Sequence, residues 1–567
     1  MAEAKPNLGR FVAQIAAVLF VLSFGLRLVG IGWGLQNDLH NQSYHPDELP
    51  VFAASQAIKP TEGKFAPGFY NYGTAYLTML KVSSDVVSAY TGGEDPKSED
   101  ATWAWVSRVH FAGRLLSALA GAGVVVAVFL SFWRTLGITG AAIAAAVPAL
   151  APALVVHSRF QTVDMVATFF LAMSSMFILR MIPAGEDDKP NLTRLAALAG
   201  VFAGLSAGTK YTGILILLSL IPVVILHHRS AALKLLAVAF GSAFLVFLIT
   251  TPGLVTDTAK FMEDFRYEMT HTSTGHGLVF EGTTSGFIYH LANLAEAIGP
   301  LVFLLGAIGL AWAAFEKKPW VASVLVFSLA YYLLIGRAEV KFLRYTFPLV
   351  IGLAAGFGFL VSEANRRGGN WRLLVGFAIF AIFGVVPRGG ITRTAEMTAW
   401  MTTDDPRDQA AKFIRASDAK TVGLASDPWF YTPPLYKNAG VTRAVPFDER
   451  LDRMRSESQP QFVYHQTAGE DPFPFDKRLI TEDKPDYIVV SSFEYADPER
   501  LWDKKTEAPL ASLNEVGKLQ VQRAHDFYQE LDKSYERAAV FGPPLATLPH
   551  DMEYIQPTVL VWKKKQK

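Results

Sequence analysis

The sequence predicts a polytopic α-helical membrane protein with a C-terminal extracytoplasmic α/β domain. Of the 567 residues, 51% are hydrophobic and 18% are charged, and the mean hydropathy is +0.25. Soluble proteins carry about 25% charged residues. The apolar residues are concentrated in long runs within residues 1–390, and residues 400–567 are polar and rich in proline. Lipid is therefore the expected solvent of the first part of the chain.

A bilayer crossing needs about 20 consecutive apolar residues. The first such run extends from Phe11 to about Trp33 and follows a short polar start. It is longer than the core of a signal peptide and no small-residue cleavage site follows it, so we interpret it as an uncleaved first span. Further runs, which bring the number of predicted spans to about eleven, lie at residues 109–132, 138–156, 162–182, 194–209, 211–227, 232–251, 292–315, 319–336, 345–362 and 371–387.

The basic residues of the short loops predict the orientation of these spans. Cytoplasmic loops carry an excess of Lys and Arg. Lys5 and Arg10 precede the first span, and basic residues recur in alternate loops, as at Arg134, Arg229 and Lys317. This pattern predicts a multi-pass protein with a cytoplasmic N-terminus, and the expected location is the plasma (inner) membrane. The outer segments are then about 34–106, a short one around 158–164, about 252–290, and everything after about 389.

The last of these segments, residues 391–567, is predicted to form one extracytoplasmic α/β domain, because about 165 residues suffice for a compact domain. Helical patterning appears at Asp408–Ala416. Strand-like runs lie at Thr421–Ala425, Tyr487–Ser491, Ala538–Phe541 and Thr558–Trp562.

Composition and missing motifs exclude several classes of function. The formal net charge is +1, which lacks the basic footprint of a nucleic-acid-binding protein. Cysteine is absent, which excludes disulfides, thiolate catalysis and Cys-ligated metals. The sequence has no Walker A motif, no GxGxxG after a strand and no GxSxG elbow, so nothing suggests a soluble nucleotide as cosubstrate.

A pair of carboxylates, Asp47 and Glu48, follows His45 and Pro46 in the first outer segment. Proline biases the preceding residue towards an extended conformation, which favours a tight turn close to the membrane surface. A carboxylate there can deprotonate an acceptor hydroxyl as general base or coordinate a divalent cation. Alternatively, the pair is a solvated loop or a helix N-cap with a first-turn acid.

Basic residues occur where the positive-inside rule predicts few, at or near the outer ends of spans. Two of them, Arg27 and Arg114, fall within apolar runs, where an ionisable group indicates function. An anionic substrate whose phosphate oxygens bind these cations explains the set, and snorkelling to lipid headgroups is the alternative. The set consists of Arg27, Arg108, Arg114, Arg159, Lys210, Arg337, Lys341 and Arg344.

Two further outer segments carry candidate polar groups. Asp164 lies five residues after Arg159 at the start of a span, where it is either a second acidic ligand or a helix N-terminal acid. His271, His276 and Glu281 lie in the third outer segment. Histidine and glutamate can bind a metal, but this spacing is not specific. A flexible loop that covers the substrate, with His contacting phosphate or sugar, is the favoured interpretation.

Five short motifs share this predicted outer placement. They are His45-Pro46-Asp47-Glu48, Gly113-Arg114-Leu115-Leu116-Ser117-Ala118, Ser158-Arg159 to Asp164, Gly208-Thr209-Lys210-Tyr211-Thr212-Gly213 and Arg344-Tyr345-Thr346-Phe347-Pro348. In their order and placement they resemble the motifs of the GT-C superfamily of integral membrane glycosyltransferases. The resemblance is greatest to the branch of the protein mannosyltransferases and lipid A aminoarabinose transferases. It covers about residues 1–390, which would form the transmembrane catalytic domain.

This resemblance implies an enzyme that takes a sugar from a polyprenyl (dolichyl or undecaprenyl) phosphate and passes it to a hydroxyl on a protein, lipid or glycan. It implies Asp47 as the base, assisted by Glu48. Lys210 and Arg344 would bind the lipid phosphate and stabilise it as the leaving group, with Arg114 and Arg27 behind them. The supporting or substrate-loop residues would be His45, Arg159, Asp164, Tyr211, His271 and His276.

Other questions stay open at this point. The WWDYG signature of oligosaccharyltransferases is absent, which disfavours en bloc transfer of a glycan to asparagine. No cofactor is certain and a divalent metal is possible. The alternative function is a transporter or flippase of lipid-linked sugars, although the sequence lacks the paired halves that transporters often have. A membrane scaffold whose C-terminal domain binds a partner is a third interpretation.

Overall fold

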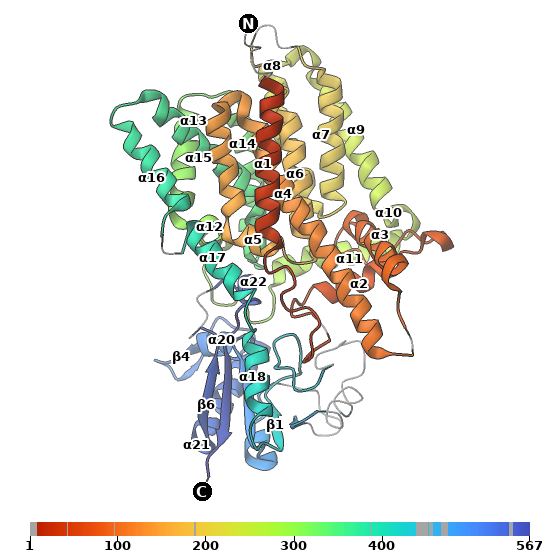
Figure 1. The fold of residues 1–567 in the computed structure, drawn as a ribbon, viewed down its shortest axis with the longest axis vertical. Coiled ribbons are helices and arrows are strands. Elements are labelled where there is room, and N and C mark those ends of the chain that lie inside the picture. Colours follow the sequence, from red (N-terminus) through yellow and green to blue (C-terminus); the bar gives the residue numbers. More distant parts are fainter. Residues whose placement is uncertain are drawn as a thin grey trace, which may run out of the picture.

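The computed structural model describes residues 8–41, 43–95, 97–185, 189–386, 388–437, 452, 458–465, 474–543 and 548–566. The chain forms a bundle of helices with a smaller α/β domain at one end of the bundle (Figure 1). The bundle contains α1 (Leu8–Leu28), α4 (Glu99–Leu150), α5 (Pro152–His157), α6 (Val163–Leu179), α7 (Leu192–Ala207), η2 (Tyr211–Ser219), α8 (Leu220–His227), η3 (Arg229–Ala231), α9 (Ala232–Thr250), α12 (Gly286–Ile298), α13 (Pro300–Phe315), α14 (Val321–Gly336), η4 (Leu343–Thr346), α15 (Phe347–Arg367) and α16 (Trp371–Phe383).

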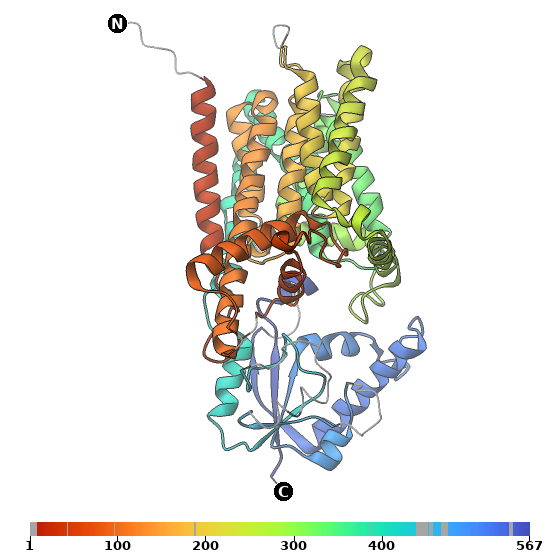
Figure 2. The same ribbon diagram turned by 90° about the vertical axis from the view of Figure 1, so that its right-hand side faces the viewer.

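Further elements lie at the end of the bundle that faces the α/β domain (Figure 2). All of them belong to the segments predicted to be outside. They are α2 (Glu48–Gln56), η1 (Pro60–Glu62), α3 (Thr74–Thr91), α10 (Gly253–Thr256), α11 (Thr258–Thr274) and α17 (Gly390–Trp400).

Within the described residues, four helical segments are long and apolar enough to cross a membrane: Leu8–Leu28, Glu99–Leu150, Arg229–Thr250 and Leu343–Arg367. The pair α12 and α13, bent by 111°, would make a fifth. The other predicted spans coincide with shorter apolar helices: Val163–Leu179, Leu192–Ala207, Tyr211–His227, Val321–Gly336 and Trp371–Phe383. Every predicted span thus has an apolar helix, and the number of crossings, about eleven, stays a prediction.

Helix α4 contains the whole of the predicted span 109–132 and most of the predicted span 138–156. Its 52 residues are interrupted at Gly137, whose φ of +69° and ψ of 172° are not helical. Residues other than glycine rarely adopt such a positive φ. The glycine therefore allows the chain to change direction between two apolar helices that follow each other without a loop.

Small residues bring the bundle helices into close contact, as is typical of membrane helices. A Cβ added at Gly309 of α13 would lie 2.0 Å from the carbonyl oxygen of Gly356 in α15. A Cβ added at Gly356 would lie 2.2 Å from the carbonyl oxygen of Gly306. The two backbones therefore touch, and a larger residue at either position would separate the helices.

The C-terminal domain is built on a five-stranded sheet in the order β2-β1-β3-β7-β6. Strands β2, β1 and β3 are parallel, and β7 is antiparallel to both β3 and β6. The domain contains α18 (Pro406–Arg415), β1 (Thr421–Leu424), β2 (Gln461–Val463), η5 (Leu479–Asp483), β3 (Tyr487–Ser491), α20 (Ser492–Arg500), β4 (Trp502–Asp503), β5 (Ala508–Pro509), α21 (Glu515–Ser534), β6 (Tyr535–Phe541), α22 (His550–Glu553) and β7 (Val559–Lys564).

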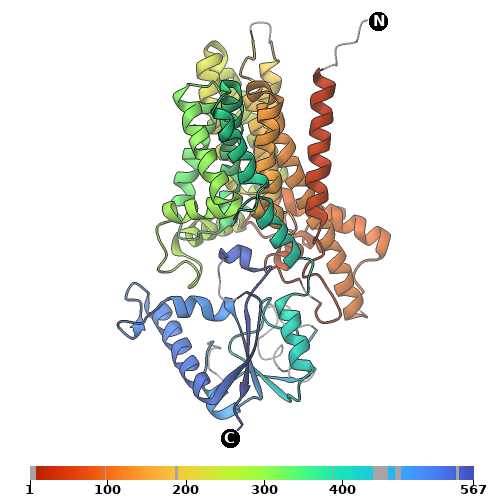
Figure 3. The ribbon, with the colours of Figure 1, turned by 60° about the vertical axis from the view of Figure 1, so that its left-hand side comes forward.

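Helices cover both faces of this sheet (Figure 3). On one face Ile414 of α18 packs with Val422 and Val489, and on the other Phe527 of α21 packs with Ile488. The predicted helix and strand runs overlap α18, β1, β3, β6 and β7. The other elements of the domain were not predicted: α20, α22, η5, β2, β4 and β5 are short, and the polar face of α21 hides its buried stripe.

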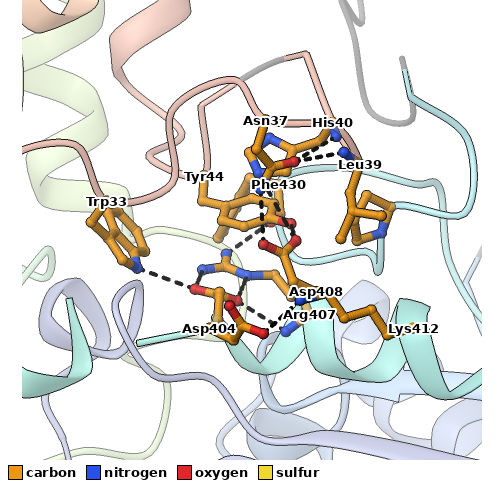
Figure 4. A network of polar contacts seen from close by, with 12 residues as sticks. Trp33, Asn37, Leu39, His40, Tyr44, Asp404, Arg407, Asp408, Lys412 and Phe430 are labelled. Atoms are coloured by element: carbon orange, nitrogen blue, oxygen red, sulfur yellow. Dashed lines mark hydrogen bonds and ion pairs between the residues drawn. The ribbon is translucent and has the colours of Figure 1, made fainter. Parts of the chain in front are cut away.

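The first outer segment is attached to α18 by a network of polar contacts (Figure 4). The Trp33 indole N–H donates to Asp405 Oδ2 at 3.2 Å, and the Asn37 amide donates to Asp408 Oδ2 at 3.0 Å. The Tyr44 hydroxyl donates to Asp408 Oδ1, and the guanidinium of Arg407 lies 3.8 Å from the Tyr44 ring centroid. The residues immediately before His45 are therefore fixed to the C-terminal domain.

Candidate active site

The guanidinium of Arg344 lies among three carboxylates from distant parts of the chain. Its Nη2 is 3.5 Å from Asp47 Oδ2, its Nε is 3.7 Å from Asp164 Oδ2, and its Nη1 is 3.7 Å from Asp551 Oδ2. The side chain of Asp47 is 34% exposed, whereas those of Asp164 and Asp551 are 6% and 1% exposed. Of the three, Asp47 is the carboxylate that a substrate can reach.

Asp47 owes its position to the turn that precedes α2. It occupies the N-cap position of that helix, but its side chain accepts no capping hydrogen bond. Its backbone N–H donates to His45 Nδ1 at 3.2 Å, and the His45 ring packs 4.4 Å from the Phe160 ring. The helix-cap alternative from the sequence is therefore correct for the backbone only, and the carboxylate remains available.

Glu48, the next residue, faces the protein interior. It forms a fully buried pair with Arg114 of α4, with Nε 2.7 Å from Oε1 and Nη2 2.8 Å from Oε2. The backbone N–H of Gln161 also donates to Oε1, at 2.8 Å. Burial raises the pKa of Glu48, but the charge and hydrogen bonds of Arg114 outweigh it and lower the pKa to about 2. Glu48 is therefore ionised and enclosed.

Lys210 extends the cationic side of the site. Its Nζ lies 2.7 Å from Asp164 Oδ1 and 4.4 Å from the centroid of the Tyr345 ring. A small cavity beside it is lined by Asp164, Lys210 and Arg344. The structure thus brings together Asp47, Asp164 and the two cations that the sequence ranked first for phosphate binding.

The segment that carries Lys210 is held against the first outer segment. The carbonyl of Gly208 accepts a hydrogen bond from the backbone N–H of Ala75 at 2.8 Å. A Cβ added at Gly73 would lie 2.1 Å from that carbonyl oxygen, so only glycine fits there. The Tyr211 hydroxyl donates to the carbonyls of Tyr70 at 2.7 Å and Tyr72 at 3.1 Å. Tyr211 thus orders this segment through backbone contacts.

Arg27 and Arg159 make their hydrogen bonds away from Arg344. Arg27 donates to Ser158 Oγ at 3.0 Å and to the Pro148 carbonyl at 2.9 Å. Arg159 donates to the Leu26 carbonyl at 3.0 Å and to a threonine hydroxyl of α17 at 2.9 Å. Both side chains are buried. The structure does not bring these two predicted cations into the cluster around Asp47.

The two histidines of the third outer segment, His271 and His276, lie at the edge of the candidate site. His276 Nδ1 is 3.3 Å from His271 Nε2, and the His276 ring packs 5.3 Å from the Phe342 ring. The Phe342 ring in turn lies under Arg344, whose guanidinium carbon is 4.0 Å from the ring centroid. Burial, reinforced by His271, lowers the pKa of His276. Arg500 of α20 binds this loop by donating to the Leu278 carbonyl at 3.0 Å.

The cluster around Arg344 also bears on the question of a metal ion. In the part of the chain that the structure describes, no group of three or more His, Asp or Glu side chains is arranged to hold a metal ion. The three carboxylates of the cluster face the guanidinium of Arg344 instead.

Sequence reasoning missed the contribution of α22. Asp551 accepts hydrogen bonds from the backbone N–H groups of Leu343 at 3.1 Å and Arg344 at 3.0 Å. The Tyr554 ring, just after α22, packs 5.0 Å from the His45 ring. These residues stand in a polar region without a motif, and no local signal in the sequence distinguishes Asp551 from the other acids of the domain.

Comparisons with known proteins relate part of the chain to a described family. Residues 105–255 match the model of the family described as dolichyl-phosphate-mannose-protein mannosyltransferase. The matched range includes Arg114, Asp164 and Lys210 and excludes Asp47 and Arg344. No curated protein sequence is significantly similar to the chain.

Solved structures show the fold. The archaeal oligosaccharyltransferase AglB from Archaeoglobus fulgidus, in complex with an inhibitory peptide and a dolichol-phosphate, superposes with a TM-score of 0.52 at 11% identity, covering 99% of this chain and 89% of that one. ArnT from Cupriavidus metallidurans, bound to undecaprenyl phosphate, is 14% identical with a TM-score of 0.48, covering 97% of this chain and 98% of that one. The family match agrees with the predicted resemblance to protein mannosyltransferases over residues 105–255, and the chain shares the fold of AglB.

Proposed function

We propose that this chain is an inverting glycosyltransferase that moves a sugar from a polyprenyl-phosphate donor to a hydroxyl acceptor on the outer face of the membrane. The observation that carries the proposal is the meeting of one accessible carboxylate, Asp47, with two cations, Arg344 and Lys210, at the end of an apolar bundle. The match to a mannosyltransferase family supports the reaction class. We propose a hexose or pentose as the transferred sugar and a protein, lipid or glycan as the acceptor.

Asp47 is the proposed general base. The acceptor oxygen attacks the anomeric carbon of the sugar while its proton passes to the Asp47 carboxylate. The bond between that carbon and the phosphate oxygen breaks, and its electrons stay on the lipid phosphate. A single displacement of this kind inverts the anomeric configuration and needs one base.

Lys210 and Arg344 are proposed to bind the lipid phosphate. Charge develops on the phosphate as the glycosidic bond breaks, and cations already in place stabilise it without reorganisation. Arg344 also lies beside Asp47 in the absence of substrate. A bound phosphate would therefore share this cation with Asp47, so that the base and the leaving group lie on the same guanidinium.

The buried ions are proposed to position these groups. The Glu48–Arg114 pair ties the start of α2 to α4, and it leaves Asp47, one residue earlier, outside the interior. We therefore assign Glu48 and Arg114 to holding the catalytic loop. Arg27 and Arg159 are assigned to joining α1 to the chain between α4 and α6.

The alternative of a flippase for lipid-linked sugars receives no support. The family match is to a transferase, and transport of an intact donor does not need an accessible carboxylate beside the phosphate-binding cations. The two functions leave different products: a transferase releases free polyprenyl phosphate, and a flippase returns the donor unchanged.

The test is a reaction with purified protein, a polyprenyl-phosphate sugar labelled in the sugar, and hydroxyl acceptors of the three classes. We expect release of polyprenyl phosphate in equal amount to a glycosylated acceptor of inverted configuration. The proposal is wrong if the donor is recovered intact with every acceptor, or if it crosses the bilayer of a reconstituted vesicle without cleavage.

A further inference from the structure

The C-terminal domain contains a large cavity that none of the residues proposed for catalysis reaches. Its volume is about 640 Å³, and it lies between α20, the β4–β5 hairpin, α21 and the edge formed by β6 and β7. Ligand cavities measure about 300–1,000 Å³. The cavity is therefore large enough for a monosaccharide or disaccharide.

Aromatic side chains form part of its wall. The rings of Trp502 and His525 are stacked with centroids 3.6 Å apart and an interplanar angle of 7°. The Gln529 amide donates to His525 Nε2 at 2.7 Å, which fixes the orientation of this ring. On the opposite strands, Arg537 lies 4.9 Å from the centroid of Trp562. Trp502 and Trp562 thus contribute aromatic rings to opposite parts of the cavity wall.

Polar groups without partners line the same space. The carboxylates of Glu499, Glu507 and Asp532 line the cavity, are exposed to solvent, and form no hydrogen bond or ion pair with any residue that the structure describes. Trp562 is 7% exposed, and its indole N–H also lacks a partner within the described residues. Buried polar groups are nearly always hydrogen-bonded. The cavity therefore combines aromatic surfaces with unused acceptors and one unused donor.

We infer that this cavity is a binding site for a neutral saccharide. A sugar ring presents C–H groups on its faces and hydroxyl donors around its rim. Aromatic rings suit the faces, and carboxylate and amide groups suit the hydroxyls. The three carboxylates exceed the two cations of the lining, Lys504 and Arg537, which disfavours a phosphorylated or acidic ligand.

The position of the cavity relates it to the candidate active site. Pro498 of α20 lines both this cavity and a second one of about 320 Å³, which also contains His276 and Phe493. The Phe493 ring stacks 5.6 Å from Tyr554, which packs against His45. A saccharide held in the large cavity would thus lie one helix away from a second cavity lined by His276 and Phe493. If the proposed function holds, a glycan acceptor is the occupant that fits this arrangement.

Binding is measurable without donor, so it tests the inference separately from the transfer reaction. The full-length protein, in a detergent without a sugar headgroup, is titrated calorimetrically with mannobiose, maltotetraose and chitotetraose, and with a lysine-rich peptide. We expect saturable binding of at least one saccharide. Trp502→Ala and Asp532→Asn should each raise its Kd at least about 10-fold. Glu515→Gln changes a 90% exposed acid on the same helix, α21, and should leave the Kd unchanged.

Three outcomes would overturn the inference: no saturable binding of any saccharide, saccharide binding that both cavity variants retain, or binding of the peptide alone. Asp532 is an exposed residue, so Asp532→Asn keeps the test decisive if Trp502→Ala fails to fold. Transfer to a small non-saccharide hydroxyl acceptor should be the same in Glu515→Gln and the unmodified protein. If the unmodified protein binds a saccharide but transfers no sugar, the proposed function is contradicted and the saccharide site is supported.

Discussion

The carboxylate of Asp551 contacts both the backbone and the side chain of Arg344. Asp551 Oδ2 accepts the backbone N–H of Arg344 at 3.0 Å and lies 3.7 Å from its Nη1. Asp551 Oδ1 accepts the preceding N–H, of Leu343, at 3.1 Å. One carboxylate of the C-terminal domain therefore fixes the turn from which the central cation of the bundle site projects.

Asp551→Asn should reduce transfer without abolishing donor binding. The amide keeps the shape of the side chain but loses its charge and one of its two acceptor oxygens, so the 343–344 turn is held less firmly. Because a misplacement of about 1 Å can cost up to about 100-fold in rate, we expect kcat to fall about 10-fold or more, with a smaller change in KM for the donor. Steady-state kinetics separate the two. Asp526→Asn, an exposed acid on α21, is the control, and an unaltered kcat in Asp551→Asn would contradict the positioning role.

Asp47→Asn should nearly eliminate transfer while donor binding persists. Removing a general base typically costs about 10²–10⁴ in rate, and the neutral amide no longer competes with phosphate for Arg344. Turnover and binding of polyprenyl phosphate are measured on the same preparation. The control is Glu62→Gln, which changes an exposed acid of the same outer segment. Turnover that survives in Asp47→Asn would assign the base to another residue.

Lys210→Gln should weaken donor binding more than acceptor binding. The substitution removes the cation 2.7 Å from Asp164, and a hydrogen bond to a charged group contributes about 1.5–3 kcal/mol. We expect the Kd for polyprenyl phosphate to rise at least about 10-fold. Lys260→Gln, at a partly exposed lysine of α11, provides the matched control. Equal donor affinity in both variants would exclude Lys210 as a phosphate contact.

Glu48 should make stability depend on acid pH. Its pKa is about 2 in the folded protein and 4.5 as an ordinary Glu, so its stabilisation is present above about pH 4.5 and is lost as the pH falls towards 2. The difference corresponds to about 3 kcal/mol. Glu48→Gln should unfold at a lower temperature near pH 6 and show a smaller loss of Tm between pH 6 and pH 3. Glu515→Gln should behave as the unmodified protein, and parallel Tm curves for Glu48→Gln would contradict the buried ion pair.

Tyr44→Phe should loosen the catalytic loop from the C-terminal domain. It removes the hydroxyl that donates to Asp408 and leaves this carboxylate, whose pKa burial raises, with one donor fewer. Hydrogen exchange of residues 33–45 should become faster, and transfer should fall by less than in Asp47→Asn. The control is Tyr90→Phe, which changes an exposed tyrosine of α3. Unchanged exchange in Tyr44→Phe would mean that Trp33 and Asn37 suffice to hold the loop.

The sequence predicted the spans and the cationic part of the site for physical reasons. Long apolar runs form helices in lipid. Cations at outer helix ends contradict the positive-inside rule, which indicates a functional role for them. It did not separate Asp47 from Glu48, because α2 begins between them and turns the second side chain inward. It could not reveal Asp551, since nothing local to residue 551 encodes a partner in η4.

This last separation affects how the protein is made. Arg344 and Asp551 are 207 residues apart in the chain, and a ribosome adds about 5–20 residues per second. Roughly 10–40 s therefore pass between the synthesis of the two residues. During this interval the turn that carries Arg344 exists without its carboxylate anchor. The newly made chain acquires a fully ordered site only when its C-terminal domain has been made and folded, so that synthesis itself delays the completion of the site.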